Sequence, residues 1–192
     1  MAPTRVLRFV AAGFAALALS GGLSACTIIK KDEVGSADEP AREGLAINVA
    51  GVDYNVFTTR ELNLKIPPDK AYYTGPAAPP GQVLYGVFIK ACAVGERTRT
   101  TSDFKVTDNQ GNVYRPKILP ASNPFSYQPR PLSKKECIPQ AGSVAQQGPT
   151  AAAMLLFQFP LLNTENRPLD MAISAVDPKT RKVETKHVDL DL

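Results

Sequence analysis

Apolar and polar residues alternate along several short stretches of this chain. Residues 46–49 and 52–57 alternate with nearly a two-residue period and are rich in β-branched and aromatic side chains. Residues 61–66 alternate strictly and stop at Pro67 and Pro68. A two-residue period places successive side chains on opposite faces of an extended strand. These stretches therefore predict β-strands, each with one buried face.

Two further stretches, 82–93 and 154–159, are apolar without alternation. Such short runs are typical of central strands that are buried on both faces. Residues 104–114 have the pattern of a hairpin, because the polar residues and glycine at 108–112 tolerate the backbone of a tight turn. The sequence therefore predicts a sheet with a fully buried centre.

Strand patterns at 170–176 and 188–192 close the chain, with a turn at 177–180 between them. The pattern predicts about eight short strands separated by turn residues, which is typical of a β-sandwich or barrel. No convincing amphipathic helix is present. The 17 prolines also argue against a helical bundle, because proline breaks helix interiors.

The first 26 residues have the pattern of an export signal. Two arginines precede an uncharged apolar run at 9–19, which Ser-Gly-Gly at 20–22 ends. Residues 23–26 (Leu-Ser-Ala-Cys) then resemble the bacterial lipobox. That resemblance implies cleavage after Ala25, acylation of Cys26, and a lipid-anchored protein on the extracytoplasmic face of the cell membrane.

Two alternatives for this segment stay open. Residues 9–29 are an uncharged stretch of 21 residues, close to the roughly 20 needed to span a bilayer. The helix-breaking residues within it argue against that alternative. The other alternative is plain secretion, with Cys26 as an ordinary thiol.

We expect three parts in the chain. Residues 1–25 are the signal peptide, 26–44 form a flexible tether of polar residues, and 45–192 form the folded domain. Cleavage removes two arginines and no acid, so the net charge falls from +4 to +2. Such a small charge does not favour nucleic acid as a partner.

Cysteine usage agrees with export. Apart from Cys26, the chain has two cysteines, Cys92 and Cys137, 45 positions apart. An even remainder in an extracytoplasmic protein predicts one disulfide. The bond would hold the polar, proline-rich segment 121–150, which has little apolar surface of its own. Two unrelated thiols, or one reactive thiol, are the alternatives.

Three blocks resemble a known family. They are 83–90 (Val-Leu-Tyr-Gly-Val-Phe-Ile-Lys), 103–114 with its turn, and 155–160 (Leu-Leu-Phe-Gln-Phe-Pro) followed by Arg-Pro-Leu at 167–169. Together they resemble bacterial extracytoplasmic, telokin-like domains of unknown function and are similar to immunoprotective extracellular antigens of actinobacteria. The resemblance implies an all-β, immunoglobulin-like β-sandwich of about seven to nine strands. The long 121–150 loop and the cysteine pair depart from the family pattern, and no catalytic motif is carried over.

Few residues have the chemistry of an enzyme or a metal site. His187, with Asp189 and Asp191, is at most a fragment of a metal site, and polar residues on a half-exposed strand are the simpler explanation. Asp108 and Asn112 would hold calcium or, more simply, cap the turn. No Gly-x-Ser-x-Gly motif is present. We therefore expect no catalysis, no metal and no cofactor.

Aromatic side chains in the expected loops predict a binding surface. It consists of Tyr72 and Tyr73 before one turn, and Phe125 and Tyr127 beside Arg130 in another loop. Loops on a rigid sandwich commonly carry binding sites, and tyrosine suits an interface. The alternative is that these rings fold back to cover the sheet edge.

These observations predict a non-catalytic binding module at the bacterial cell envelope. Its partner would be an envelope protein or a wall polymer, and the membrane would be contacted through the lipid on Cys26. The alternative is a carrier that delivers a small molecule or ion to a membrane transporter. A deep apolar pocket with converging polar groups would favour the carrier.

Overall fold

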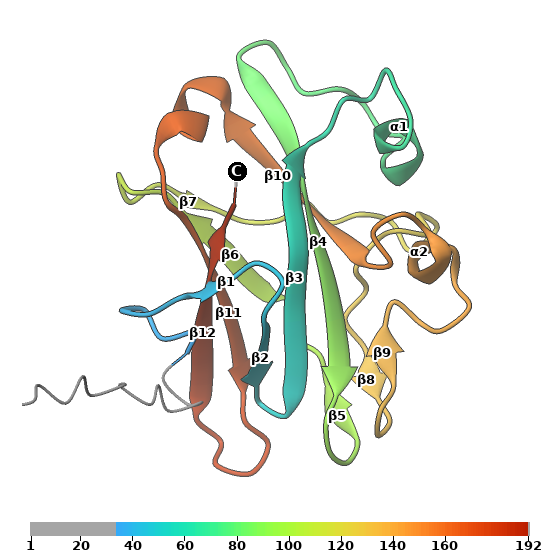
Figure 1. The fold of residues 1–192 in the computed structure, drawn as a ribbon, viewed down its shortest axis with the longest axis vertical. Coiled ribbons are helices and arrows are strands. Elements are labelled where there is room, and N and C mark those ends of the chain that lie inside the picture. The colour runs from blue at the N-terminus through green and yellow to red at the C-terminus, as the bar shows by residue number, and fades with distance from the viewer. Residues whose placement is uncertain (1–33, 192) are drawn as a thin grey trace, which may run out of the picture.

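The longest strand is β4 (Gln82–Ala93), which pairs antiparallel with β10 (Ala153–Pro160) at the centre of the molecule (Figure 1). The computed structural model describes residues 34–191. Both strands are buried on both faces for most of their length, as their continuous apolar runs predicted. Their side chains therefore contribute to two separate clusters, one on each side of the sheet.

The described residues form an all-β sandwich, which confirms the expected fold class. The first sheet has the order β1 (Ala41–Arg42), β12 (Val183–Leu190), β11 (Leu169–Val176), β6 (Asp103–Thr107) and β7 (Val113–Tyr114). The second has the order β10, β4, β3 (Val52–Glu61) and β2 (Ala46–Val49), and β9 (Cys137–Ile138) pairs with β4. The remaining elements are the two-stranded sheet β5 (Thr98–Arg99) with β8 (Pro131–Leu132), the short helices α1 (Asp69–Tyr72) and α2 (Val144–Gln147), and the 3₁₀ helix η1 (Leu161–Glu165).

The main core lies between the two large sheets. Alternate side chains of β4 and β10 face it, among them Val87, Ile89, Leu155 and Phe157. Phe104 of β6 is also part of this core. Burying such side chains stabilises a fold by about 1.5–3 kcal/mol each. The core therefore holds the sandwich together.

A second apolar cluster covers the opposite face of the β4–β10 sheet. We call it the outer cluster, and Phe88 of β4 is fully buried in it. Its buried members are Leu62, Tyr72, Leu84, Phe88, Leu119, Phe125, Ala145, Ala152, Met154 and Leu156. The cover comes from α1 and from the long excursion 115–152 between β7 and β10, which includes α2. This cover explains why β4 and β10 are apolar on both faces.

One of two local expectations needs correction. Residues 61–66 do not continue as a strand, because β3 ends at Glu61 and Leu62 is buried in the outer cluster. The backbone N–H of Asn63 donates to the Asp69 carboxylate at 2.9 Å, which turns the chain towards α1. The hairpin expected at 104–114 is confirmed as β6 and β7.

The tether expected at 26–44 is wrong for residues 34–44, and its first part lies outside the described residues. Ala41 is buried, and β1 pairs in parallel with β12. The N–H of His187 donates to the carbonyl of Gly35 at 2.7 Å. An outer strand leaves unpaired backbone groups, and this segment covers those of β12. The folded part therefore begins well before residue 45.

Candidate functional site

The cysteine pair fixes the middle of the excursion that covers the sheet. Cys92 of β4 and Cys137 of β9 lie directly opposite each other and form a disulfide, as their number predicted. The N–H of Ala93 donates to the carbonyl of Glu136 at 3.0 Å, and that of Lys135 donates to Ala93 at 3.1 Å. The bond and the backbone contacts together fix the excursion to the central strand.

The aromatic surface expected from the sequence is wrong for three of its rings. Tyr72 is only 1% exposed, and Phe125 and Tyr127 are each 6% exposed. The Tyr72 ring packs edge-on against Phe88, with centroids 4.7 Å apart, and against Phe125 at 4.9 Å. Tyr72 and Phe125 are buried because the outer face of the β4–β10 sheet is itself apolar, whereas Tyr127 is buried in the main core. The alternative of buried rings is therefore correct, although Tyr72 and Phe125 cover a face of the sheet and not its edge.

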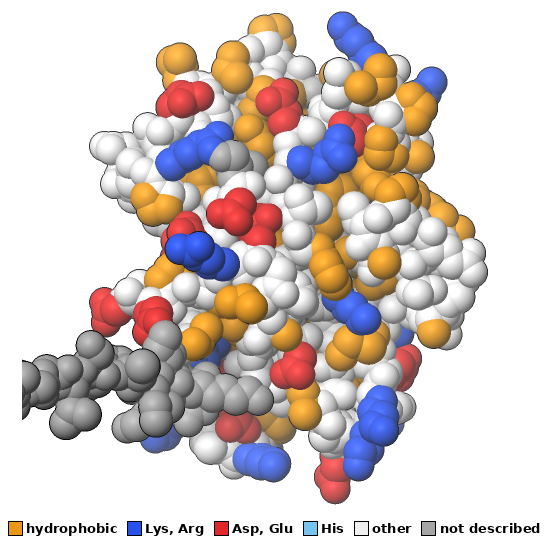
Figure 2. All heavy atoms as spheres, in the orientation of Figure 1, with side chains coloured by type: hydrophobic (Ala, Val, Ile, Leu, Met, Phe, Trp, Pro, Cys, Tyr) orange, Lys and Arg blue, Asp and Glu red, His pale blue; other side chains and the backbone are white. Residues whose placement is uncertain are grey.

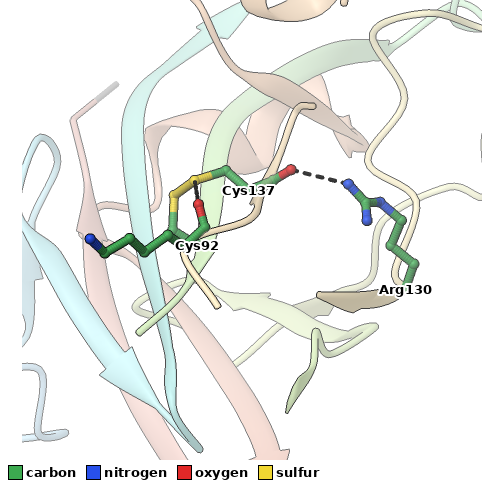
Figure 3. Close-up of a disulfide and its surroundings, with 4 residues drawn as sticks. Cys92, Arg130 and Cys137 are labelled. Carbon is green, nitrogen blue, oxygen red and sulfur yellow. Dashed lines mark hydrogen bonds between the residues drawn. A yellow bond between two sulfur atoms is a disulfide. The ribbon is translucent and has the colours of Figure 1, made fainter. Parts of the chain in front are cut away.

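Arg130 does not lie beside these rings as an exposed cation. Its guanidinium points towards the disulfide segment and donates to the carbonyl of Cys137 at 3.2 Å (Figure 3). It also forms an ion pair with Glu136. Tyr73 is half-buried at the surface. The five residues expected to form one binding surface are thus divided between the outer cluster, the core and separate surface positions.

An exposed apolar residue marks a different candidate site. Ile118 is 99% exposed, although both of its neighbours are fixed. The N–H of Lys117 donates to the carbonyl of Leu156 on β10 at 2.7 Å, and Leu119 is buried in the outer cluster. These anchors hold the Ile118 side chain out towards solvent. We call residues 117–119 the Ile118 ridge.

A hollow of about 440 Å³, which we call hollow I, lies on one side of the ridge. Phe104 and Tyr127 form part of its wall, with ring centroids 5.2 Å apart and nearly perpendicular planes. The Tyr127 hydroxyl donates to the carbonyl of Thr101 at 3.0 Å, and burial raises its pKa well above the ordinary value. This ring is therefore a fixed, neutral part of the hollow.

A second hollow of about 560 Å³, hollow II, lies on the other side. Tyr73 and the turn that follows α1 form one wall, and the segment from Ile118 to Pro124 forms the other. The side-chain amide of Asn123 donates to the carbonyl of Tyr72 at 2.9 Å and holds the two walls together. Ile118 and Leu119 line both hollows. The ridge therefore joins the two hollows into one continuous surface feature.

The charges around hollow I are positive. Arg115 and Lys117 line it, and no carboxylate does. Arg115 contacts Asp103 at the rim at 2.9 Å, but both side chains are more than half exposed, so this ion pair is weak. The Lys117 ammonium donates to the Gln158 side chain. Hollow I thus presents apolar walls beside two cations, which suits an apolar group that has a carboxylate near it.

The sequence contains one feature that marks this ridge, although it belongs to no strand pattern. Ile118 and Leu119 stand between Pro116 and Pro120, outside any strand. An isolated apolar pair in a loop usually contributes to the core, as Leu119 does. Only the structure shows that its neighbour Ile118 remains outside.

Asp108 is the hydrogen-bonding centre of the β6–β7 hairpin. Its carboxylate accepts from two backbone N–H groups, from the amides of Asn112 and Asn166, and from the Tyr114 hydroxyl, at 2.8–3.1 Å. Burial alone would raise the pKa of Asp108, but these hydrogen bonds outweigh burial and lower it from 3.8 to about 2. Because all five partners are donors, Asp108 caps the turn and does not present a cation site.

His187 belongs to a polar row on the outer face of the first sheet. Its Nδ1 lies 2.7 Å from the Asp170 carboxylate, and Asp170 is directly opposite Asp189 in the β11–β12 pair. Burial raises the pKa of Asp189, and the charges of Asp191 and Asp170 add to this effect. No group of three metal-ligating side chains occurs within residues 34–191.

Cys26, the predicted lipid attachment site, lies outside the described residues. In the part of the chain that the structure describes, no helix has the length and apolar character required to cross a membrane.

Comparisons with known proteins do not assign this chain to a family. No protein-family model matches the chain, and no curated protein matches it. Among solved structures, the chain is similar to the YjhA protein of Bacillus subtilis, with a TM-score of 0.44 and 10% identity. That alignment covers 79% of this chain and 99% of YjhA.

Proposed function

We propose that this chain is a lipid-anchored protein of the bacterial cell envelope, similar to the telokin-like extracytoplasmic domains, and that its sandwich is a non-catalytic binding module. The export pattern before Cys26 and the lipobox resemblance support the location. The disulfide between Cys92 and Cys137 also supports it, because such bonds persist outside the reducing cytosol. The Ile118 ridge is the binding surface.

The observation that carries this proposal is the exposure of Ile118 between two hollows. A single exposed apolar side chain is ordinary on a protein surface. Ile118 is fixed on both sides. The backbone of Lys117 is hydrogen-bonded to β10, and the Leu119 side chain is buried in the outer cluster. A rigid apolar projection loses little conformational entropy when a partner covers it. The ridge is therefore suited to act as a central apolar contact of an interface.

The partner that fits best is an envelope protein with an acidic, partly apolar segment. Its apolar side chains would occupy hollows I and II on either side of Ile118. A carboxylate of the same segment would lie near Arg115 and Lys117, the two cations of hollow I, and would compete with Asp103 for Arg115. Complementary charge at the rim of an interface increases the association rate and the specificity.

The small-molecule carrier is the second candidate. The volume of hollow I, about 440 Å³, lies in the range of ligand pockets, which is about 300–1,000 Å³. Its two cations would bind a small apolar anion. This candidate predicts a ligand that co-purifies with the protein, whereas the binding module predicts a partner protein.

Crosslinking in intact cells tests the proposal. A photoreactive amino acid replaces Ile118 in the full chain and, as a matched control, Leu162 of η1, which is 86% exposed. We expect a reproducible protein adduct from position 118 only, and we expect Arg115→Glu with Lys117→Glu to reduce its yield. Equal adducts from both positions would overturn the proposal. No adduct together with a co-purified small anion would establish the carrier instead.

A further inference from the structure

Three loops at one end of the sandwich lie against one another. They are 94–99 after β4, 133–136 before β9, and 176–184 in the β11–β12 hairpin, at the lower end in Figure 1. Residues of 94–99 and 176–184 line a common hollow. The backbone N–H of Lys135 donates to the carbonyl of Ala93 at 3.1 Å, which places 133–136 beside the first loop. We call this surface the basic end.

Positive charge is concentrated there. The three loops contain seven Lys and Arg side chains and four carboxylates, a net charge of +3. The other described residues hold eleven cations and twelve carboxylates, a net charge of −1. Figure 2 shows Lys and Arg side chains at this end of the molecule. The basic end is therefore the positive pole of an otherwise slightly negative domain.

The cations at this end face solvent, and the carboxylates mostly do not. All seven Lys and Arg residues are exposed, whereas Glu136, Asp177 and Glu184 are half-buried. Glu136 pairs with Arg130, Asp177 accepts from the N–H of Lys179 at 2.7 Å, and Glu184 accepts from the N–H of Ala50 at 2.8 Å. The solvent-facing surface of the basic end is therefore more positive than its net charge of +3 indicates.

Exposed valines accompany these cations. Val94, Val176 and Val183 are all more than half exposed at the ends of the loops. Lys135 and Arg181 have backbone φ angles of 62° and 60°, a region in which glycine or asparagine costs less than a long side chain. Cations beside exposed apolar side chains fit the interface of a bilayer, where headgroups meet acyl chains.

The position at which the chain enters the described domain also favours a membrane contact at the basic end. The Lys186 ammonium contacts the carbonyl of Val34 at 3.5 Å, and Lys186 lies three residues, or about 10 Å along β12, from Val183. Eight residue steps separate Val34 from Cys26, a reach of at most about 28 Å. A lipid on Cys26 would therefore hold the basic end close to the membrane.

We infer that the basic end lies on an anionic membrane surface and orients the domain. This inference deepens the proposed function and rests on it for the location of the membrane. In this orientation α1 and the neighbouring wall of hollow II lie at the far end, as Figure 1 shows for α1. The Ile118 ridge then remains accessible to a partner in the envelope.

Vesicle binding without the lipid tests this inference. The probe is the mature chain, residues 26–192, with Cys26→Ser, so that no acyl group attaches. Its co-sedimentation is measured with vesicles of phosphatidylcholine alone and with vesicles that also contain phosphatidylglycerol. We expect binding to the anionic vesicles only, and a decrease as salt screens the charges.

Matched charge reversals identify the surface. Lys179→Glu with Lys182→Glu changes two exposed lysines of the basic end, and Lys65→Glu with Lys70→Glu changes two exposed lysines near α1. We expect the first pair to lower the partition coefficient by about tenfold or more and the second by much less. Equal effects of the two pairs, equal binding to neutral vesicles, or binding to soluble polyglutamate without binding to vesicles would overturn the inference.

This assay is independent of the proposed function. It uses no acyl group, so a failure of acylation in cells leaves its result unchanged. It also leaves Ile118 intact, so a failure of crosslinking at position 118 is a separate result.

Discussion

The disulfide determines how firmly the cover of the sheet is held, and its removal gives the sharpest prediction. The perturbation is Cys92→Ser with Cys137→Ser. The two cysteines are 45 residues apart, and the loop-entropy estimate for a closed loop of this length is about 4 kcal/mol. This loop contains the Ile118 ridge, Phe125 and Tyr127. Its loss therefore affects both global stability and the candidate site.

The backbone contacts of β9 remain in the variant, so part of the order is kept. Pairing of Ala91 with Ile138, and the hydrogen bonds between Ala93 and the segment before β9, do not need the sulfurs. We expect the free energy of unfolding to fall by about 2–4 kcal/mol. We also expect proteases to cleave the excursion 115–152 in the variant before the sandwich unfolds.

Urea unfolding of the oxidised chain, the reduced chain and the double variant measures this effect. The reduced chain is the matched control, because it lacks the bond but keeps both cysteines. We expect it to agree with the double variant. A loss below about 0.5 kcal/mol, the usual effect of a surface substitution, would refute the role given to the disulfide.

Three further changes test the packing and the electrostatics, each by urea unfolding. Asp108→Ala should destabilise by about 2 kcal/mol near neutral pH, because a pKa lowered from 3.8 to about 2 is worth that much. The ionised Asp108 stabilises the fold above pH 3.8, and this stabilisation is lost as the pH falls towards 2. The difference in unfolding free energy between the natural chain and Asp108→Ala should therefore shrink over this range. A constant difference would contradict this role of Asp108. Phe88→Ala removes the ring beneath Tyr72 and should cost about 3–5 kcal/mol; a cost under 1 kcal/mol would argue against the outer cluster. Burial, together with the charges of Asp191 and Asp170, raises the pKa of Asp189, so the ionised form is the unfavourable one in the fold. Asp189→Asn should therefore stabilise slightly at neutral pH, by less than about 1 kcal/mol, with the gain vanishing below the ordinary pKa, and a destabilisation at neutral pH would contradict it.

The strands were predictable because their patterns follow from burial. The apolar run at 82–93 predicted a strand buried on both faces, and β4 is one. The polar residues at 108–112 predicted the β6–β7 hairpin, and Asp108 caps it. The cysteine count predicted the disulfide. For the strand and the hairpin a local pattern was sufficient, whereas the disulfide followed from the number of cysteines in the whole chain.

The cover of the sheet was not predictable from such patterns. Tyr72 and Phe125 lie in segments with turn residues around them, which indicated exposed loops. Their burial depends on Phe88, a distant residue on the outer face of β4. A fully apolar strand requires a cover on both faces, and that requirement, applied to 82–93, would have favoured burial of the rings.

The remaining errors come from short segments. β1 has only two residues, Ala41 and Arg42, too few for any period, and its order depends on pairing with β12. The sequence did not identify Ile118 as an exposed residue. Its exposure depends on two tertiary contacts of its neighbours, Lys117 with β10 and Leu119 with the outer cluster. These features depend on tertiary contacts, which a reading of hydrophobic periodicity does not include.

The central claim is that this sandwich works at a membrane outside the cytosol. Mass spectrometry of the N-terminal peptide, isolated from the organism that makes the protein, tests it most directly. We expect a chain that begins at Cys26 and carries acyl groups on that residue. A native chain that still begins at Met1, or a Cys26 with an unmodified thiol, would contradict it.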